Sequence, residues 1–130
     1  MWQRAMENSV AIYKLTSQFP SQEIYGLTSQ LRRASVSVAS NIAEGYGRTS
    51  RGEFRHFLGM ARGSNCELAT QLVLAERLEF GDQTLINASA ELAGEVDRML
   101  NAMIKGLENQ TTVTKPLVAR AARTAAHSNV

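Results

Sequence analysis

The sequence has few of the residues that build metal centres, disulfide frameworks and common active sites. Among its 130 residues there are one cysteine, two histidines and two prolines. A single cysteine, Cys66, excludes an internal disulfide and a CxxC metal or redox pair. His56 and His127 are far apart, and no HxxxH or ExxH pattern is present. We therefore expect no metal and no cofactor.

Long apolar runs and alternating strand-like segments are also absent. No run approaches the roughly 20 apolar residues that cross a bilayer. The beginning, MWQRAMENSV, has no signal-peptide pattern, so we expect a cytoplasmic protein without a membrane partner. Because prolines and alternating Val/Ile/Thr-rich stretches are scarce, the composition favours helices. The length suits one domain.

The net charge is only +2, but it is unevenly distributed. Residues 30–62 hold six arginines and two glutamates, whereas residues 63–110 hold three basic and eight acidic residues. Residues 111–130 add three basic residues and no acid. A basic centre beside an acidic second half indicates polar docking or an anionic ligand.

Apolar residues recur at helical spacing in four stretches, at about 2–19, 21–45, 50–80 and 82–109. Four helices with short connections predict an all-α fold, an antiparallel up-down four-helix bundle over residues 1–110. Residues 111–130 have little apolar bulk and no long pattern, so we predict a flexible basic tail.

In the first predicted helix, the residues at helical spacing are Trp2, Ala5, Met6, Ser9, Ile12 and Tyr13.

The boundaries of the second and third predicted helices have local signals. Gly45 and Gly47 are expected to end the second helix in the left-handed conformation. Thr49 or Ser50 can cap the third, with Glu53 at capping-box distance from Ser50.

The third predicted helix is apolar on more than one face. Met60, Leu74 and Leu78 lie away from its main apolar face, which predicts a subunit interface in so small a domain. Gly59 and Gly63 each cost roughly 1 kcal/mol inside a helix, so we expect another helix to approach them closely.

The arginines carry the main functional hypothesis. Six of them belong to two helices joined by one loop: Arg32, Arg33, Arg48, Arg51, Arg55 and Arg62. Guanidinium groups suit phosphate, so these residues predict a surface that binds RNA or DNA. The alternative is that they pair with acidic residues of the third and fourth helices, within or between subunits.

Asn41 and Glu44 are a second candidate pair. Either they bond backbone groups near the break at Gly45 or a neighbouring helix, or they form a ligand site. An enzyme using Glu44 or Cys66 is a third hypothesis, but no base and nucleophile stand together in the sequence.

The stretch FPSQEIYGLTSQLRRASVSVASNIAEGYGR, followed by EFRHFLGMARGSNCEL, resembles the ribosomal S23-like proteins. That four-helix-bundle family is encoded within intervening sequences of bacterial 23S ribosomal RNA genes and elsewhere in bacterial genomes. The resemblance runs from WQRAM to about Leu107 and rests on QLRRAS, NIAEG, YGR and ARGS together. Its motif positions are Gln30, Arg32, Arg33, Asn41, Glu44, Gly45, Gly47 and Arg48.

The resemblance implies that the bundle assembles into a ring-shaped homo-oligomer, a pentamer. A similar protein is the accessory subunit of diversity-generating retroelements, where it partners a reverse transcriptase and nucleic acid. No catalytic residue carries over from the family. The leading expectation is a non-enzymatic ring-forming accessory factor that binds RNA or DNA. The alternative is a protein-interaction scaffold whose arginines dock an acidic partner or a neighbouring subunit.

Overall fold

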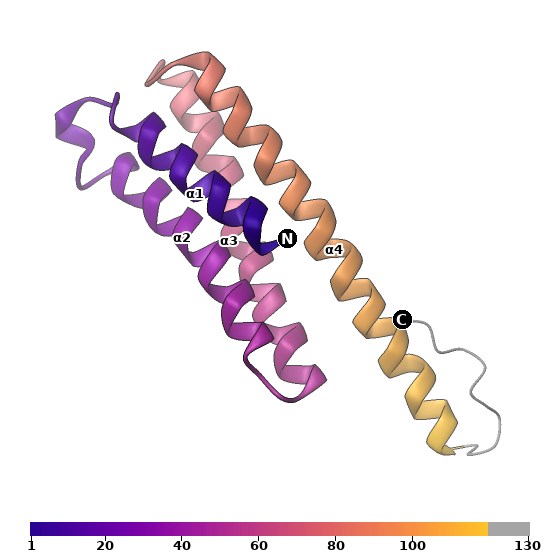
Figure 1. The fold of residues 1–130 in the computed structure, drawn as a ribbon. Coiled ribbons are helices and arrows are strands. Elements are labelled where there is room, and N and C mark those ends of the chain that lie inside the picture. The colour runs from indigo at the N-terminus through magenta and orange to yellow at the C-terminus, as the bar shows by residue number, and fades with distance from the viewer. Residues whose placement is uncertain (120–130) are drawn as a thin grey trace.

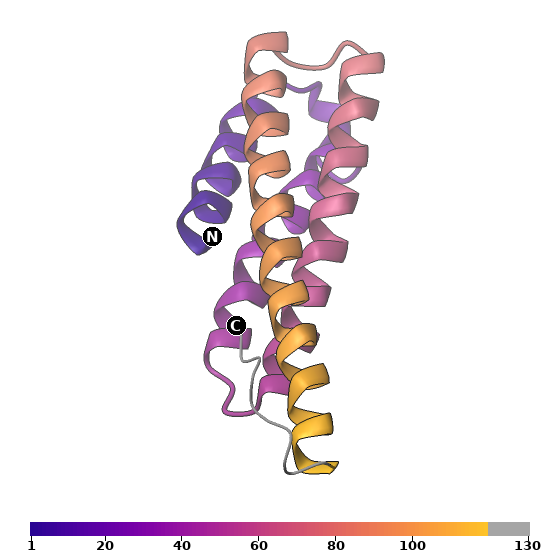
Figure 2. The same cartoon turned by 90° about the vertical axis from the view of Figure 1, so that its right-hand side faces the viewer.

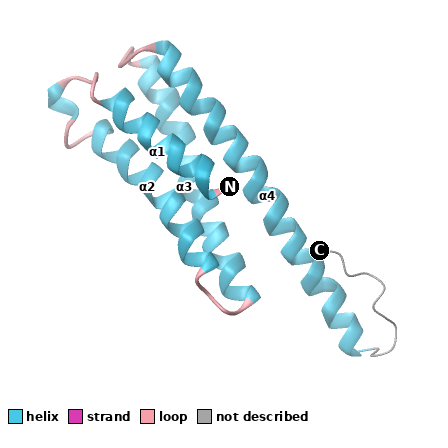
Figure 3. Ribbon diagram, viewed as in Figure 1, coloured by secondary structure: helices cyan, strands magenta, loops and turns pink. Residues whose placement is uncertain are grey.

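The computed structural model describes the backbone of residues 1–119 and the side chains as far as Asn109. It contains four α-helices and one short 3-10 helix, and the described residues form no strand (Figure 3). The all-α prediction is therefore confirmed. The elements are α1 (Trp2–Thr16), η1 (Ser21–Glu23), α2 (Leu27–Tyr46), α3 (Arg51–Arg77) and α4 (Gln83–Ala119).

The helices form an up-and-down bundle in which consecutive helices run antiparallel (Figure 1). Helix α2 packs against α1 and α3, and α4 packs against α3 and α1. Helix α1 therefore lies in a channel between α2 and α4. None of the described helices is long and apolar enough to span a membrane.

The helices differ greatly in length, from 15 residues in α1 to 37 in α4. Helix α1 covers only one half of the bundle, and beyond its N-terminus only α2, α3 and α4 continue (Figures 1 and 2). The core is accordingly divided into two clusters. One contains Ile12, Leu31 and Leu72, and the other contains Ile42 and Leu100, with Ala5 as the contribution of α1.

The start of α2 differs from the prediction. The chain first makes η1 and a turn, and α2 begins at Leu27 rather than near Ser21. Glu23 Oε1 accepts a hydrogen bond of 2.9 Å from the Leu27 N–H group. A Cβ atom on Gly26 would lie 2.6 Å from the same oxygen. Glycine at position 26 therefore leaves room for Glu23 to cap α2 from outside the helix.

The end of α2 also corrects the prediction. Gly47 caps the helix with φ −84°, and Gly45 lies inside the helix, so neither is left-handed. A Cβ atom on Gly45 would lie 3.2 Å from both Phe54 Cδ1 and Phe57 Cβ. The glycine at 45 serves close packing of α2 against α3. The predicted cap of α3 is confirmed, because Ser50 Oγ accepts a hydrogen bond of 3.1 Å from the Glu53 N–H group.

Two glycine predictions about α3 need correction. Among the described residues no other helix approaches Gly59 or Gly63, since a Cβ atom on either would meet none of their atoms within 4 Å. Helix α3 also ends at Arg77, before the predicted end at Phe80. The left-handed glycine is Gly81, with φ 77°, in the turn to α4.

Helix α4 begins where predicted and ends later. Asp82 Oδ1 accepts a hydrogen bond of 3.1 Å from the Thr84 N–H group and so caps the helix. The helix runs to Ala119, past the predicted end near Asn109, because no glycine or proline between Glu108 and Lys115 ends it. The rest of the predicted tail, residues 120–130, lies outside the described residues.

Candidate interaction surfaces

Arg32 and Arg33 project to different sides of α2. Arg32 Nε donates a hydrogen bond of 2.9 Å to Thr16 Oγ1, and its guanidinium carbon lies 4.6 Å from the centroid of the Tyr13 ring. Arg32 therefore lies against α1. Arg33 lines a groove of about 340 Å³ between α2 and α3. Neighbouring residues on a helix point about 100° apart, which separates the two arginines.

Arg55 and Arg62 pair with acidic residues of α4. An Arg55 guanidinium nitrogen contacts Glu108 Oε2, and Arg62 Nε lies 3.3 Å from Asp97 Oδ1. The alternative interpretation of the arginines expects such pairs with acidic residues of the fourth helix, and both pairs form within one subunit. All four side chains are 40–48% exposed, so each pair contributes only about 0–1 kcal/mol to stability.

Arg48 is engaged at the end of α2. Its Nη2 atom lies 2.6 Å from Glu44 Oε2, and its guanidinium carbon lies 4.9 Å from the centroid of the Phe57 ring. The six predicted arginines are thus divided among the α1–α2, α2–α3 and α3–α4 sides and the α2–α3 turn. Among the described residues, the side chains of Arg33 and Arg51 make neither a hydrogen bond nor an ion pair.

The α2–α3 groove is polar. Gln30, Arg33 and Ser37 line it from α2, and Glu67 and Gln71 line it from α3. At its edge the two helices are joined by the hydroxyl groups of Ser37 and Ser64, whose oxygens are 2.8 Å apart.

Asn41 Nδ2 donates a hydrogen bond of 2.9 Å to the backbone oxygen of Ser37, so this amide serves its own helix. The carboxylate of Glu44 bonds the Arg48 side chain instead of a backbone group. The structure therefore places Asn41 and Glu44 in separate local contacts.

An exposed apolar stripe on α1 is the feature that sequence reasoning missed. Trp2, Met6, Val10 and Tyr13 are 41%, 42%, 55% and 47% exposed, and we call these four residues the α1 stripe. The six residues that the sequence places on one apolar face of α1 therefore differ in burial. Ala5, Ser9 and Ile12 are buried, whereas the other three are exposed. The missed signal is the spacing of four, four and three residues, which keeps the stripe within about 80° of the helix circumference.

Polar contacts hold α1 in place beneath this stripe. Ser9 Oγ lies 3.2 Å from Ser35 Oγ of α2, and Asn8 Oδ1 accepts a hydrogen bond of 2.6 Å from Ser89 Oγ of α4. Arg4 Nε lies 2.8 Å from Glu95 Oε2 of α4. A hydrogen bond to Glu7 and the charge of Glu95 raise the pKa of Arg4. The stripe is therefore presented by a fixed helix.

A second exposed apolar set lies on α3. Met60, Leu74 and Leu78 are 45–49% exposed, on a different side of the helix from the buried Leu58, Leu68 and Leu72. Helix α3 thus has more than one apolar face, as the sequence predicts.

A third feature is an apolar hollow of about 560 Å³ at the N-terminal end of α1, which we call the end groove. Met1 closes it at the α1 end, and Tyr46 of α2 lines one wall. Helix α4 forms the opposite wall with Met99, Ala102, Met103, Gly106 and Leu107.

The enzyme hypothesis names Glu44 and Cys66, and the structure places them in separate surroundings, Glu44 beside Arg48 and Cys66 between α3 and α4. Cys66 is exposed in a hollow between α3 and α4, where Arg62, Glu76 and Asp97 are the charged lining residues. The ring of His56 packs against Phe57, with 5.4 Å between the centroids. Within the described part of the chain, no three His, Cys, Asp or Glu side chains could hold a metal ion together.

These observations define an all-α helical-bundle protein whose distinctive features are surfaces and grooves. Residues 1–102 match the sequence model of the 23S rRNA-intervening sequence proteins, and the chain belongs to this family. The family resemblance found in the sequence is therefore confirmed.

A solved structure from Bacteroides thetaiotaomicron has a similar fold. It is a protein of unknown function from the S23 ribosomal protein family, with a TM-score of 0.72 and 24% sequence identity. The match covers 80% of this chain and 97% of that chain. No curated protein matches the chain. Family and fold are thus established, and neither comparison names a biochemical activity.

Proposed function

We propose that this protein is a non-enzymatic, self-assembling helical scaffold that binds other proteins in the cytoplasm. The α1 stripe carries the proposal. Four large apolar side chains lie on one helix, and each is 41–55% exposed. The free energy of the system falls when another protein covers such a surface and removes it from water. Two of them, Trp2 and Tyr13, belong to the residue types that dominate binding energy at interfaces.

Two different apolar surfaces support assembly with further copies of the chain. The α1 stripe and the exposed residues Met60, Leu74 and Leu78 lie on separate helices, α1 and α3. A contact between two different patches is head-to-tail, and it forms a ring when its rotation closes and an open filament when it does not. This supports the ring-shaped homo-oligomer. The pentamer is the subunit number that the family resemblance implies.

The arginines fit the scaffold better than one nucleic-acid surface. Arg55 and Arg62 join α3 to α4, while Arg32 and Arg48 contact Tyr13 and Phe57. Arg33 and Arg51 remain available to an acidic partner or a neighbouring subunit. The motif residues Gln30 and Gly45 then have supporting roles, the first in the α2–α3 groove and the second in helix packing.

Light scattering coupled to size exclusion tests the assembly. We expect the wild-type mass to be a multiple of the 14.2 kDa chain. The double substitution Met6→Lys with Val10→Lys should lower this mass toward the monomer, because two cations would have to be buried in the interface. Each site is exposed in the single chain, so the helical content should be unchanged.

Ser40→Lys with Ala88→Lys is the matched control. Both Ser40 of α2 and Ala88 of α4 are exposed and belong to neither apolar surface, and we expect the oligomer to persist in this double variant. A wild-type protein that elutes as a 14.2 kDa monomer at micromolar concentration contradicts the proposal.

A second candidate function is binding of RNA or DNA as an accessory factor to a larger protein. The observation that favours it is the pair of unpartnered arginines, Arg33 and Arg51. One subunit would bind phosphate weakly through two residues, whereas a ring would repeat them and multiply the contacts.

A further inference from the structure

Two rows of polar side chains face each other across the α2–α3 groove. A spacing of three and then four residues keeps each row on one side of its helix. The rows are Gln30, Arg33 and Ser37 on α2, and Ser64, Glu67 and Gln71 on α3. The two ends of the rows are in contact. At one end Gln71 Nε2 donates a hydrogen bond of 3.4 Å to Gln30 Oε1, and at the other the hydroxyl groups of Ser37 and Ser64 meet.

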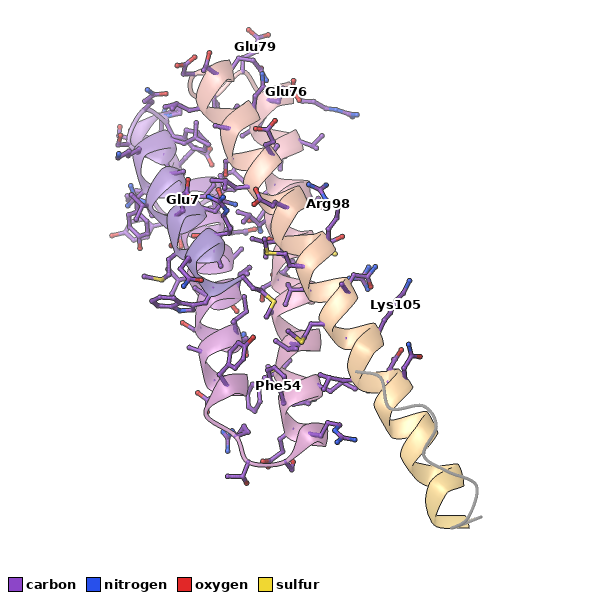
Figure 4. The ribbon with its side chains drawn as sticks, turned by 45° about the vertical axis from the view of Figure 1, so that its right-hand side comes forward. Glu7, Phe54, Glu76, Glu79, Arg98 and Lys105 are labelled. Atoms are coloured by element: carbon purple, nitrogen blue, oxygen red, sulfur yellow. The ribbon has the colours of Figure 1, made fainter. Side chains whose placement is uncertain are left out.

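Arg33 and Glu67 lie between these two contacts and have opposite charges. Both residues are exposed, and neither side chain makes a hydrogen bond or an ion pair with a described residue. Other unpaired charges are isolated, since Arg98 and Lys105 project from the outer side of α4 (Figure 4). In the α2–α3 groove, by contrast, a cation and an anion line the same hollow. One ligand that carries both charges can therefore pair with both residues.

Gln71 contributes a third group without a partner. Its Oε1 atom is buried and accepts no hydrogen bond, and among the described residues it is the one buried side-chain polar atom in this state. A buried acceptor without a donor costs free energy. Because Gln71 lines the groove, a rotation of its terminal amide brings this oxygen to a donor bound there. An ammonium group beside Glu67 is such a donor.

The lining of the groove restricts the class of ligand. Ala34 is the one apolar residue among the described residues that line it, so a large apolar or aromatic group would find little surface to cover. The charges of Arg33 and Glu67 cancel, which does not favour a polyanion. The volume of about 340 Å³ is at the lower end of the range for small-molecule sites. A small zwitterion meets all three restrictions.

We propose that the α2–α3 groove binds a small zwitterion of the α-amino acid class. Its carboxylate pairs with the guanidinium group of Arg33, and its ammonium group donates hydrogen bonds to Glu67 and Gln71. The ligand thereby joins the two rows at the level where the chain leaves them unpaired. This site goes beyond the scaffold function and does not depend on it, because all its residues belong to one subunit.

Three related probes test the two charges of the ligand separately. Near neutral pH, L-alanine carries both charges, N-acetyl-L-alanine carries only the carboxylate, and L-alaninamide carries only the ammonium group. Saturation-transfer-difference NMR with the full chain measures the affinity of each probe. We expect L-alanine to bind at least about tenfold more tightly than either probe with a single charge.

Substitutions assign each charge of the ligand to its residue. Arg33→Gln should remove the advantage of L-alanine over L-alaninamide, and Glu67→Gln should remove its advantage over N-acetyl-L-alanine. Arg51→Gln and Glu91→Gln are the matched controls, because each removes an exposed, unpaired charge outside the groove. All four positions are exposed, so circular dichroism should show unchanged helical content.

Four results would overturn the inference. Three of them are no saturation transfer to L-alanine, equal binding of the three probes, and equal effects of the groove substitutions and their controls. The fourth is binding of N-acetyl-L-alanine alone, which would assign Arg33 to anions, as the nucleic-acid function requires. Self-assembly is measured separately, in the light scattering of the Met6 and Val10 variants, so the two proposals fail independently.

Discussion

Glycine has opposite effects at different positions of this chain. Gly81 adopts φ 77°, and a Cβ atom there would lie 2.7 Å from Cδ1 of the fully buried Leu15. Gly59 is in the middle of α3, where a Cβ atom would meet nothing within 4 Å. The first glycine is required by its conformation and surroundings, and the second only costs helix stability.

Alanine substitutions should therefore change stability in opposite directions. We expect Gly81→Ala to lower the free energy of unfolding by about 1–2 kcal/mol, because alanine disfavours positive φ. Gly59→Ala should raise it by up to about 1 kcal/mol through helix propensity. Urea denaturation measures both. A loss of stability in Gly59→Ala would show that another surface packs against this glycine.

The sequence could not assign the arginines to sides of the bundle. Arg32 and Arg33 are neighbours in the chain, yet one lies against α1 and the other lines the α2–α3 groove. Arg55 and Arg62 lie on one side of α3, as their spacing predicts, and their acidic partners on α4 are Glu108 and Asp97. Spacing places side chains on one helix, but pairing between helices depends on packing.

At the scale of elements, the caps set where the helices begin. Ser50 and Asp82 cap α3 and α4 through side-chain oxygens, and Ser50 is one of the two N-cap residues that the sequence indicates for α3. The cap of α2 could not be predicted from an N-cap residue in the sequence. Glu23 reaches Leu27 from η1, and this depends on the turn at Gly26.

The cap formed by Glu23 gives a prediction about α2. Glu23→Ala should lower the free energy of unfolding by about 1 kcal/mol, because the Leu27 N–H group loses its acceptor. Glu23→Gln keeps an oxygen there and should cost less. Urea denaturation compares the two with Gln22→Ala, an exposed neighbour that should be neutral. Equal losses in the alanine and glutamine variants would contradict the cap.

The unequal helix lengths matter more than any single cap. The apolar pattern indicates four helices, and four are present. The predicted ranges already make the first helix the shortest, but they do not show which part of α2 and α4 it leaves uncovered. That difference in length creates the end groove, so the groove could not be predicted from the sequence.

At the scale of the whole molecule, salt dependence distinguishes the two candidate functions. If the protein binds nucleic acid, its affinity for a single-stranded RNA should fall steeply between about 50 and 200 mM salt. Arg33→Ala with Arg51→Ala should weaken binding more than Arg55→Ala with Arg62→Ala, because the latter two arginines are already paired. Fluorescence anisotropy measures both effects. Absent or salt-independent binding would leave the scaffold as the function.

The sequence by itself determined the fold class, the family and the starts of α1, α3 and α4, because these follow from local spacing, caps and motifs. The tertiary structure decided which apolar and charged residues are free for a partner. It buried Ala5 and Ile12 but left Trp2 and Val10 exposed, and it paired Arg62 while leaving Arg33 unpaired. The physical reason is that each helix has several faces, and only packing against the other helices selects the ones that remain in water.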